Sequence, residues 1–235
     1  MILCLETAFD NCSVALFDPA SKLMIAENSV AADRKHTELL LPMVEQLLTD
    51  NGLSMSELDA IAFNRGPGAF TGLRINTATA QGLATALGIG CIPVASLRAI
   101  AQARLAQLEG DSAQAIVSVI DARMDEFYLA SYTVSDAFDL VEADTEQLMS
   151  VDAATEWLAQ KAHADFHVVS PEASRINAVM TKSGLAGIVA EQSISAVDIG
   201  RVALGVSPVE PHLAQPVYLR HNAWKTIEQQ QKPTG

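Results

Sequence analysis

The sequence predicts an α/β protein made of two tandem units with similar element order. Hydrophobic residues make up 49% of the 235 residues and aromatic residues only 5%, which predicts a core of mainly aliphatic and alanine side chains. Apolar runs of strand length alternate with longer runs of helical spacing, and this order occurs twice along the chain. The length is sufficient for one large domain or two small ones.

The first half of the chain predicts the order β-β-β-α-β-α-β-α. Strands are expected at 1–7, 12–18, 22–30, 58–65 and 91–96, and helices at 36–52, 70–88 and 97–110. Pro42 lies near the start of the first helix, so this helix is expected to begin after Pro42 or to bend there. Asn51 and Gly52 supply its C-terminal stop signal.

The second half repeats most of this pattern. Strands are expected at 113–121, 126–134, 139–148 and 166–170, and helices at 152–162, 172–184 and 195–206. Two consecutive β-β-β-α-β-α units are the pattern of the actin-like ATPase (ribonuclease H-like) fold. We therefore expect an N-terminal lobe over 1–108, a C-terminal lobe over 109–210, and a tail over 211–235 that returns to the N-terminal lobe and then frays.

Charge and cysteine usage restrict the function classes. The net charge of -13 disfavours direct binding of a polyanion over a large surface, although a basic partner could make such contacts. Cys4, Cys12 and Cys91 are scattered in apolar runs and are expected to be buried thiols in a reducing compartment. The sequence has neither a signal-peptide pattern nor an apolar run of membrane-spanning length, which favours the cytoplasm.

The segment NRGPGAFTGLR, residues 64–74, holds three glycines between a predicted strand and a predicted helix. It fails the Walker pattern, because Leu73 and Arg74 stand where Lys and Ser/Thr are required, and it fails the dinucleotide pattern at Thr71. Free N–H groups at the helix start would favour an anion. An anion there would contact Gly66, Gly68, Thr71, Gly72 and Arg74. The alternative is a tight turn with Thr71 as the N-cap.

Four stretches together resemble the bacterial TsaB (YeaZ) family: ILCLETAFDNCSVALF, KHTELLLPMV, RGPGAFTGLRINTATAQGLA and IDARMDEFYLASY. A fifth stretch, PVYLRHNAW, is similar to the C-terminal signature of that family. The resemblance implies an actin-like fold of two lobes whose nucleotide site is degenerate. It also implies a non-catalytic subunit that binds and stimulates a catalytic paralogue, TsaD. With the small ATPase TsaE, this complex transfers threonylcarbamoyl to the adenosine next to the anticodon of ANN-reading tRNAs.

The resemblance has further implications for ligands and partners. The chain alone is expected to bind no cofactor, because ATP with Mg²⁺ and a metal ion belong to the partner subunits. Contact with tRNA is expected only indirectly, through the complex, and no membrane contact is expected. In the absence of partners we expect a homodimer.

The acids of the predicted cleft bear on a second hypothesis, a self-sufficient actin-like ATPase or kinase. Such an enzyme needs acids at strand ends in both lobes for hydrated Mg²⁺, and glycines that expose backbone N–H groups to phosphates. The candidate acids are Glu6, Asp10 and Asp121. However, Ala8 stands where a glycine is expected, and VVSPEAS has Pro171 and no glycine at the expected purine pocket. We therefore expect these acids to cap turns at the cleft.

Small residues form two rows on the predicted helix 70–88, one with Ala78, Gly82 and Ala86 and one with Ala80 and Ala84. One row would be buried in its own lobe, and the other would let a second helix approach closely. That helix could belong to the same lobe or to another subunit, and the resemblance favours another subunit.

Helix 36–52 is the expected companion in this docking surface, because Leu39 and Met43 fall off its predicted core face. The expected interface residues are His36, Leu39, Met43, Phe70, Arg74, Thr77, Ala78, Gln81 and Ala84. A large charged residue in place of Thr77 or Ala84 is expected to block assembly.

The histidines do not predict a metal site. His163 and His167 have i,i+4 spacing in HADFH, but His167 belongs to a predicted strand, so the two rings should not share a helix face. By the resemblance, His36 matches the first position of the metal-binding His-x-x-x-His pair of the catalytic paralogue, and Leu40 occupies the second position. A metalloprotease is therefore not expected, and the sequence has no G-x-S-x-G elbow.

Overall fold

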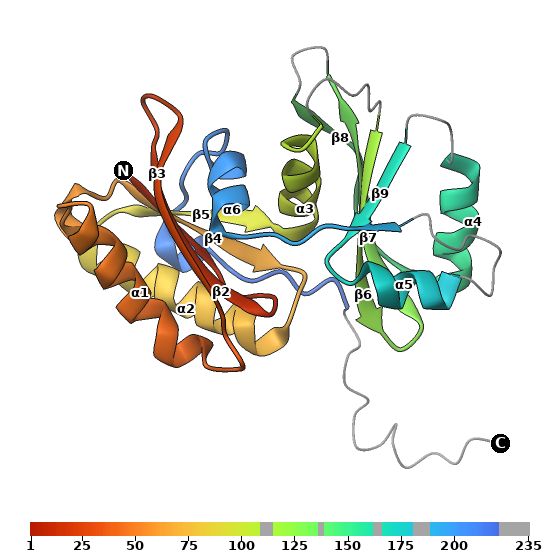
Figure 1. Ribbon diagram of the computed structural model, residues 1–235, viewed down its shortest axis with the longest axis horizontal. Coiled ribbons are helices and arrows are strands. Elements are labelled where there is room, and N and C mark those ends of the chain that lie inside the picture. Colours follow the sequence, from red (N-terminus) through yellow and green to blue (C-terminus); the bar gives the residue numbers. More distant parts are fainter. Residues whose placement is uncertain (109–114, 136–138, 162–165, 181–188, 221–235) are drawn as a thin grey trace.

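A computed structural model describes residues 1–108, 115–135, 139–161, 166–180 and 189–220. Two mixed β-sheets with flanking helices form two lobes (Figure 1). His163 of the HADFH segment and the terminal residues expected to fray lie outside the described residues.

The sheet of the N-terminal lobe has the strand order β3-β2-β1-β4-β5. These strands are β1 (Ile2–Glu6), β2 (Asn11–Asp18), β3 (Leu23–Ala31), β4 (Ala60–Gly66) and β5 (Gly90–Ala95). β2 is antiparallel to β1 and β3, whereas β1, β4 and β5 are parallel. All five residues of β1 are buried, because this central strand is covered on both faces, and its sequence is accordingly a continuous apolar run before Glu6.

Helices α1 (His36–Asp50) and α2 (Phe70–Leu87) cover one face of this sheet (Figure 1). Helix α1 begins at His36 and contains Pro42, so the first of the two expected alternatives, a start after Pro42, is wrong. The first helical turn is already complete before the proline, and Pro42 lies on the exposed side. Helix α2 is capped at its C-terminus by Gly88, whose φ of 68° is the left-handed conformation that glycine adopts without strain.

The sheet of the C-terminal lobe has the order β8-β7-β6-β9-β10 when it is read from β8. In both sheets the strands therefore lie in the order third, second, first, fourth and fifth of their lobe. Its elements are β6 (Ala115–Arg123), β7 (Glu126–Val134), β8 (Leu140–Ser150), α4 (Val151–Lys161), β9 (Phe166–Ser170), α5 (Ala173–Met180) and β10 (Val189–Glu191). Strand β10 was not expected, because three residues are too few to show a periodic pattern. With β10 included, the tandem α/β architecture predicted from the sequence is confirmed.

Helices α3 (Ser96–Leu105) and α6 (Ala196–Ala203) lie between the two sheets (Figure 1). Helix α3 packs mainly on β6 of the second sheet, whereas α6 packs on β1 and β2 of the first sheet. One hydrophobic cluster therefore joins both lobes, and it includes Phe17, Ile100, Tyr132 and Ile199. Helix α6 therefore packs on the first sheet, although it comes after the strands of the second sheet in the chain.

After α6 the chain returns along the N-terminal lobe. Val209 forms an antiparallel bridge with Cys91 of β5, through backbone hydrogen bonds of 2.9 and 2.7 Å. The short 3-10 helix at Pro211–Leu213 lies against α2, and Gln81 Nε2 donates hydrogen bonds to the carbonyl oxygens of Pro211 (3.0 Å) and Ala214 (2.9 Å). The tail thereby covers the edge of β5 that would otherwise be open.

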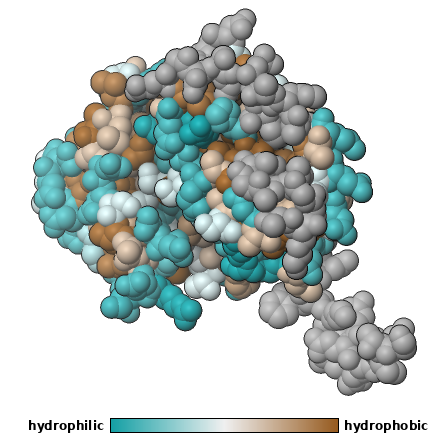
Figure 2. Space-filling model, turned by 45° about the vertical axis from the view of Figure 1, so that its right-hand side comes forward, coloured by the Kyte–Doolittle hydropathy of each residue, from teal (hydrophilic) through white to brown (hydrophobic). Residues whose placement is uncertain are grey.

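Among the described helices, none has the length and apolar character needed to cross a membrane. Figure 2 shows hydrophobic residues in separate patches among hydrophilic residues on the face that it displays.

Two helical glycines provide a matched test of the α6 packing. A Cβ atom at Gly200 would lie 2.1 Å from Cε2 of Phe17, whereas a Cβ atom at Gly82 would have no heavy atom within 4 Å. We expect Gly82→Ala to raise the free energy of unfolding by up to about 1 kcal/mol, through helix propensity. We expect Gly200→Ala to lower it by about 1–3 kcal/mol, through overpacking. Urea unfolding measures the free energy of unfolding of each variant. Equal values for the two variants would contradict the close packing of Gly200 against Phe17.

Candidate functional site

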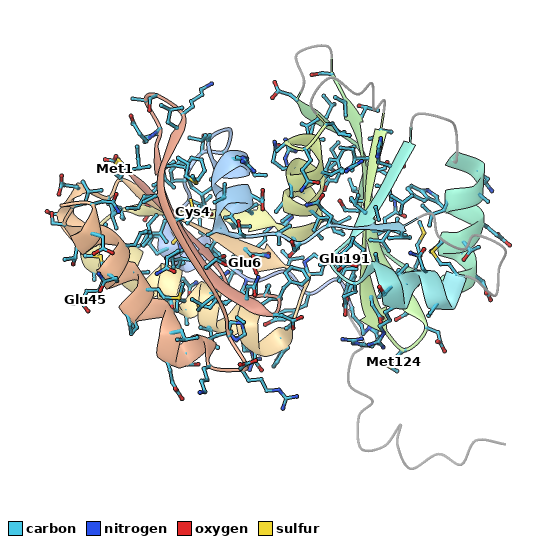
Figure 3. All side chains as sticks on the ribbon, in the orientation of Figure 1. Met1, Cys4, Glu6, Glu45, Met124 and Glu191 are labelled. Atoms are coloured by element: carbon cyan, nitrogen blue, oxygen red, sulfur yellow. The ribbon has the colours of Figure 1, made fainter. Side chains whose placement is uncertain are left out.

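A cleft of about 1200 Å³ lies between the two lobes. The first lobe contributes the turn after β1, the loop before α1 and the glycine turn before α2, and the second lobe contributes the β6–β7 hairpin and the loop after β9. Charged side chains from both lobes line it, among them Asp10, Arg34, Asp121, Arg123, Glu172 and Glu191. In Figure 3, Glu191 lies in the second lobe across from Glu6 at the end of β1.

Glu6 is fully buried beneath the cleft rather than exposed in it. Its Oε1 atom accepts a hydrogen bond from the Ala8 backbone N–H at 2.5 Å, and its Oε2 atom accepts one from Asn64 Nδ2 at 2.5 Å. Both carboxylate oxygens are therefore already bonded within the chain. Glu6 acts as a cap of the turn after β1, which is the role that the sequence favoured over Mg²⁺ binding.

Asn64 connects Glu6 to two further elements. Its Oδ1 atom accepts hydrogen bonds from the Gly66 backbone N–H at 2.8 Å and from Ser96 Oγ at 2.6 Å. Asn76 of α2 donates to the carbonyl oxygens of Leu5 and Asn64 at 3.3 and 3.2 Å. Sequence reasoning missed Asn64, Ser96 and Asn76, although polar residues at the end of an apolar strand run or on the buried face of a helix are a recognisable signal.

The two other predicted acids, Asp10 and Asp121, do line the cleft. Asp121 forms ion pairs with Arg123 at 3.1 Å and with Arg175, and its side chain is only 8% exposed. Burial raises the pKa of Glu172 beside this group; Arg123 lowers that pKa, while Asp121 and Asp10 raise it. The acid of the second lobe is thus neutralised by arginines, which leaves it poorly suited to bind a hydrated divalent cation.

The glycines at 68 and 72 allow the segment before and at the start of α2 to lie close to the turn after β1. A Cβ atom at Gly72 would lie 2.0 Å from the Thr7 carbonyl oxygen, and one at Gly68 would lie 2.9 Å from the Ala8 Cβ. The Ala69 N–H donates to the Ala8 carbonyl at 3.0 Å, and Gly66 has a φ of 104°. These contacts explain the three glycines by packing and backbone conformation, and they support the tight-turn alternative.

The expectation that Thr71 is the N-cap is wrong. Helix α2 begins at Phe70, its N-cap is Ala69, and no side chain caps it. Thr71, Gly68 and Gly72 line the cleft, whereas Gly66 is buried within the turn. The five residues expected to contact an anion are therefore split between the cleft wall, the interior of the turn and, for Arg74, the exposed side of α2.

The predicted interface residues fall into three groups by exposure. Phe70, Arg74 and Ala78 are exposed, and His36, Leu39 and Gln81 are half-buried. Met43, Thr77 and Ala84 are buried. The assignment of Met43 to a surface off the core face is wrong, because the buried face of α1 is wide enough to include it. Ala84 belongs with Ala80 to the row that packs inside the lobe, so neither Thr77 nor Ala84 suits a surface test.

An exposed stripe remains along α2, as the two rows of small residues predicted. We name it the α2 stripe, and it consists of Arg74, Ala78, Gly82, Thr85 and Ala86. At its N-terminal end the Arg74 guanidinium carbon lies 3.9 Å from the centroid of the Phe70 ring. Tyr218 of the tail also adjoins Phe70, with its ring centroid 5.7 Å from that of Phe70. Tyr218 was not singled out in the sequence, because the tail has no periodic pattern.

The histidines and cysteines carry structural contacts. His36 Nε2 lies 3.0 Å from the Phe9 carbonyl oxygen, and His167 Nδ1 accepts a hydrogen bond from Arg104 at 3.0 Å. Within the described ranges, no group of three or more His, Cys, Asp or Glu side chains is placed to hold a metal ion. All three cysteines are buried, and burial raises the pKa of the Cys12 and Cys91 thiols to about 11, so thiolates are scarce at neutral pH.

The buried Glu6 carboxyl makes stability depend on pH in a definite direction. Burial raises its pKa from 4.5 to about 7, and the hydrogen bonds from Asn64 and Ala8 offset only part of this effect. Between these values the folded state binds more protons than the unfolded state, so stability decreases as pH rises from 4.5 through 7. The full effect is on the order of 3 kcal/mol.

We expect this slope to be absent in Glu6→Gln, which keeps the side-chain volume but has no titrating carboxyl. Urea unfolding of both proteins from pH 5 to pH 8 measures the difference between their free energies of unfolding. The contributions of the other acids are the same in both proteins and cancel in this difference. A difference that does not change with pH would contradict the assignment of this pKa.

Comparison with known proteins agrees with this geometry. A family model described as TsaD, tRNA N6-adenosine threonylcarbamoyltransferase, matches residues 28–208. The tRNA threonylcarbamoyladenosine biosynthesis protein TsaB of Haemophilus influenzae is 31% identical, over 96% of each chain. TsaB of Escherichia coli is 31% identical, over 96% of this chain and 97% of its own.

Two solved structures from Pseudomonas aeruginosa share the fold. One is described as YeaZ, with a TM-score of 0.74 and 31% identity, and the other as an uncharacterized protein with similarity to peptidase YEAZ, with a TM-score of 0.75 and 32% identity. Each alignment covers 93% of this chain and 99% of the other. The predicted actin-like, ribonuclease H-like fold of two lobes is thereby confirmed. With a family model that covers most of its length and TsaB relatives along nearly the whole chain, this protein belongs to the TsaB (YeaZ) family, a group that the TsaD model also recognises.

Proposed function

We propose that this chain is a non-catalytic subunit in tRNA threonylcarbamoyladenosine biosynthesis. In this proposal it binds and stimulates a catalytic paralogue of the TsaD type and acts with the ATPase TsaE. The observation that carries the proposal is the state of the cleft acids. Glu6 is buried with both oxygens hydrogen-bonded, and Asp121 is paired with two arginines, so neither acid is free to hold Mg²⁺.

The α2 stripe is the proposed docking surface, together with the exposed side of α1. Ala78, Gly82 and Ala86 present little side-chain volume, which lets the backbone of a partner helix come close. Leu41 on α1 is 50% exposed and Phe70 is 47% exposed, so this face also offers apolar side chains at its edges. The paralogue shares the fold, and we propose that the same face forms a homodimer when the paralogue is absent.

The proposal assigns ATP, Mg²⁺ and the metal ion to the partner subunits. It also assigns tRNA binding to the assembled complex in the cytoplasm, because the net charge of this chain is -13 and repels a polyanion. The stimulated reaction is threonylcarbamoyl transfer to the adenosine next to the anticodon of ANN-reading tRNAs.

Calorimetric titration of the isolated chain with Mg-ATP tests the non-catalytic role. We expect no tight binding and no release of phosphate, because Glu6 and Asp121 are both bonded within the chain. Asp121→Asn serves as the internal comparison. If Asp121 only holds Arg123 and Arg175, this substitution should change neither the binding of Mg-ATP nor the release of phosphate. Tight binding followed by turnover would instead favour the self-sufficient ATPase or kinase, and loss of that turnover in Asp121→Asn would identify its acid.

Reconstitution of threonylcarbamoyl transfer tests the docking surface. We expect the paralogue and the ATPase to transfer faster when this chain is added. We expect Ala78→Arg to weaken the complex by roughly a hundredfold, because a long charged side chain holds the two helices apart. Titration of each variant against the rate of transfer measures this loss.

Ala159→Arg is the matched control, since Ala159 is an exposed alanine on α4 of the other lobe. It should stimulate transfer as the unmodified chain does. Equal stimulation by Ala78→Arg and Ala159→Arg would show that the α2 stripe is not part of the interface. If the unmodified chain did not stimulate transfer, the proposed function itself would be overturned.

A further inference from the structure

The described part of the tail contacts both lobes in succession. On the first lobe, Ala214 is fully buried in the hydrophobic cluster beneath α1 and α2, and its carbonyl oxygen accepts from Gln81. Three residues further on, the Val217 N–H donates to the Arg65 carbonyl at the end of β4, at 2.8 Å. This segment is therefore fixed to the first lobe by burial and by hydrogen bonds at several points.

Arg220 attaches the same segment to the second lobe. Its Nη2 atom donates to the carbonyl oxygens of Ala122 and Arg123 at 3.0 and 3.1 Å, and forms an ion pair with Glu126. The Arg220 side chain is only 15% exposed, so these contacts are shielded from solvent more than a surface ion pair is. Charge-assisted bonds of this kind are among the stronger ones in proteins.

The anchor point is a tight hairpin turn. Arg123, Met124 and Asp125 between β6 and β7 all have positive φ values, of 66°, 56° and 56°. Successive left-handed residues other than glycine are strained, and they persist only where surrounding contacts hold them. Arg220 supplies such contacts, because it binds the carbonyl oxygens at the start of the turn and the carboxylate at its end.

A further polar link between the two lobes lies near this crossing. The Arg65 side chain forms an ion pair with Glu146 of β8 at 2.7 Å, while the Arg65 carbonyl holds Val217. The tail reaches the hairpin on the side of the molecule away from α3 and α6, near Met124 (Figures 1 and 3). The lobes are thus joined on one side by shared hydrophobic packing and on the other by a segment of chain.

We infer that residues 209–220 form a strap that fixes the two lobes relative to each other, with Arg220 as its anchor in the second lobe. The role that we infer for the strap is conformational. Because Phe70 and Arg123 line the cleft and also adjoin the strap, the strap sets the width of the cleft at this end. The inference does not depend on the proposed function.

Spin labels on opposite lobes test the strap. Glu45→Cys on α1 and Glu156→Cys on α4 place labels at exposed positions, while the three native cysteines are buried. Electron-electron double resonance measures the distribution of distances between the two labels. We expect a narrow distribution for the labelled chain and a broad one when Arg220→Gln is added. The amide of Val217 should exchange faster by roughly tenfold in Arg220→Gln, since it loses the anchor next to it. Arg220→Lys should restore part of the narrow distribution through Glu126.

Arg123→Gln is the matched control, because it also removes one positive charge beside this hairpin, but the ion pairs of the Arg123 side chain join it to Asp121 and Glu172 within the second lobe. It should leave the distance distribution narrow. Should Arg220→Gln fail to fold, Glu126→Gln replaces it and should broaden the distribution to a smaller extent. The strap is overturned if the distribution stays narrow without the anchor, or if Arg123→Gln broadens it as much as Arg220→Gln does.

Discussion

The buried amide of Asn64 is the interaction on which the cleft region depends. It bonds Glu6 at the end of β1, the Gly66 N–H in the glycine turn and the Ser96 hydroxyl at the start of α3. A central strand, the turn before α2 and a helix that packs on the other lobe are therefore held by one fully buried side chain. Its loss would leave several buried polar groups without partners at once, which costs far more than one surface hydrogen bond.

This network also shows how two of the cleft acids are used within the chain. In a cleft that binds Mg²⁺, the strand-end carboxylates must face the solvent and keep free lone pairs. Here Glu6 uses both oxygens for the turn after β1 and for Asn64, while Asp121 is paired with arginines from two segments of the second lobe. The same residue types thus stabilise the walls of the cleft, and Gly68 and Gly72 leave the room that Thr7 and Ala8 occupy.

The sequence predicts most elements because their signals are local, and it fails where the deciding contact is distant in the chain. The β-rich runs and helical spacings identify nearly every strand and helix, including the exposed and buried rows of α2. An amphipathic pattern shows that α6 has an apolar face but cannot show that this face packs on the first sheet. Met43 was misplaced because the buried width of α1 depends on how closely α2 lies beside it. Thr71 was misplaced because the Ala8 carbonyl fixes the turn one residue before the helix.

The tail shows how the start of α2 and the second lobe are physically connected. Arg74, Phe70 and Tyr218 lie in contact one after another, and Arg220 follows Tyr218 by two residues. A partner that packs on the start of α2 would therefore touch side chains adjacent to the segment that binds the β6–β7 hairpin. The tail and the shared core of α3 and α6 thus both restrain the first lobe, which carries this surface, relative to the second lobe. A subunit that acts through its surface benefits from such rigidity, because a preorganised surface loses less entropy on binding.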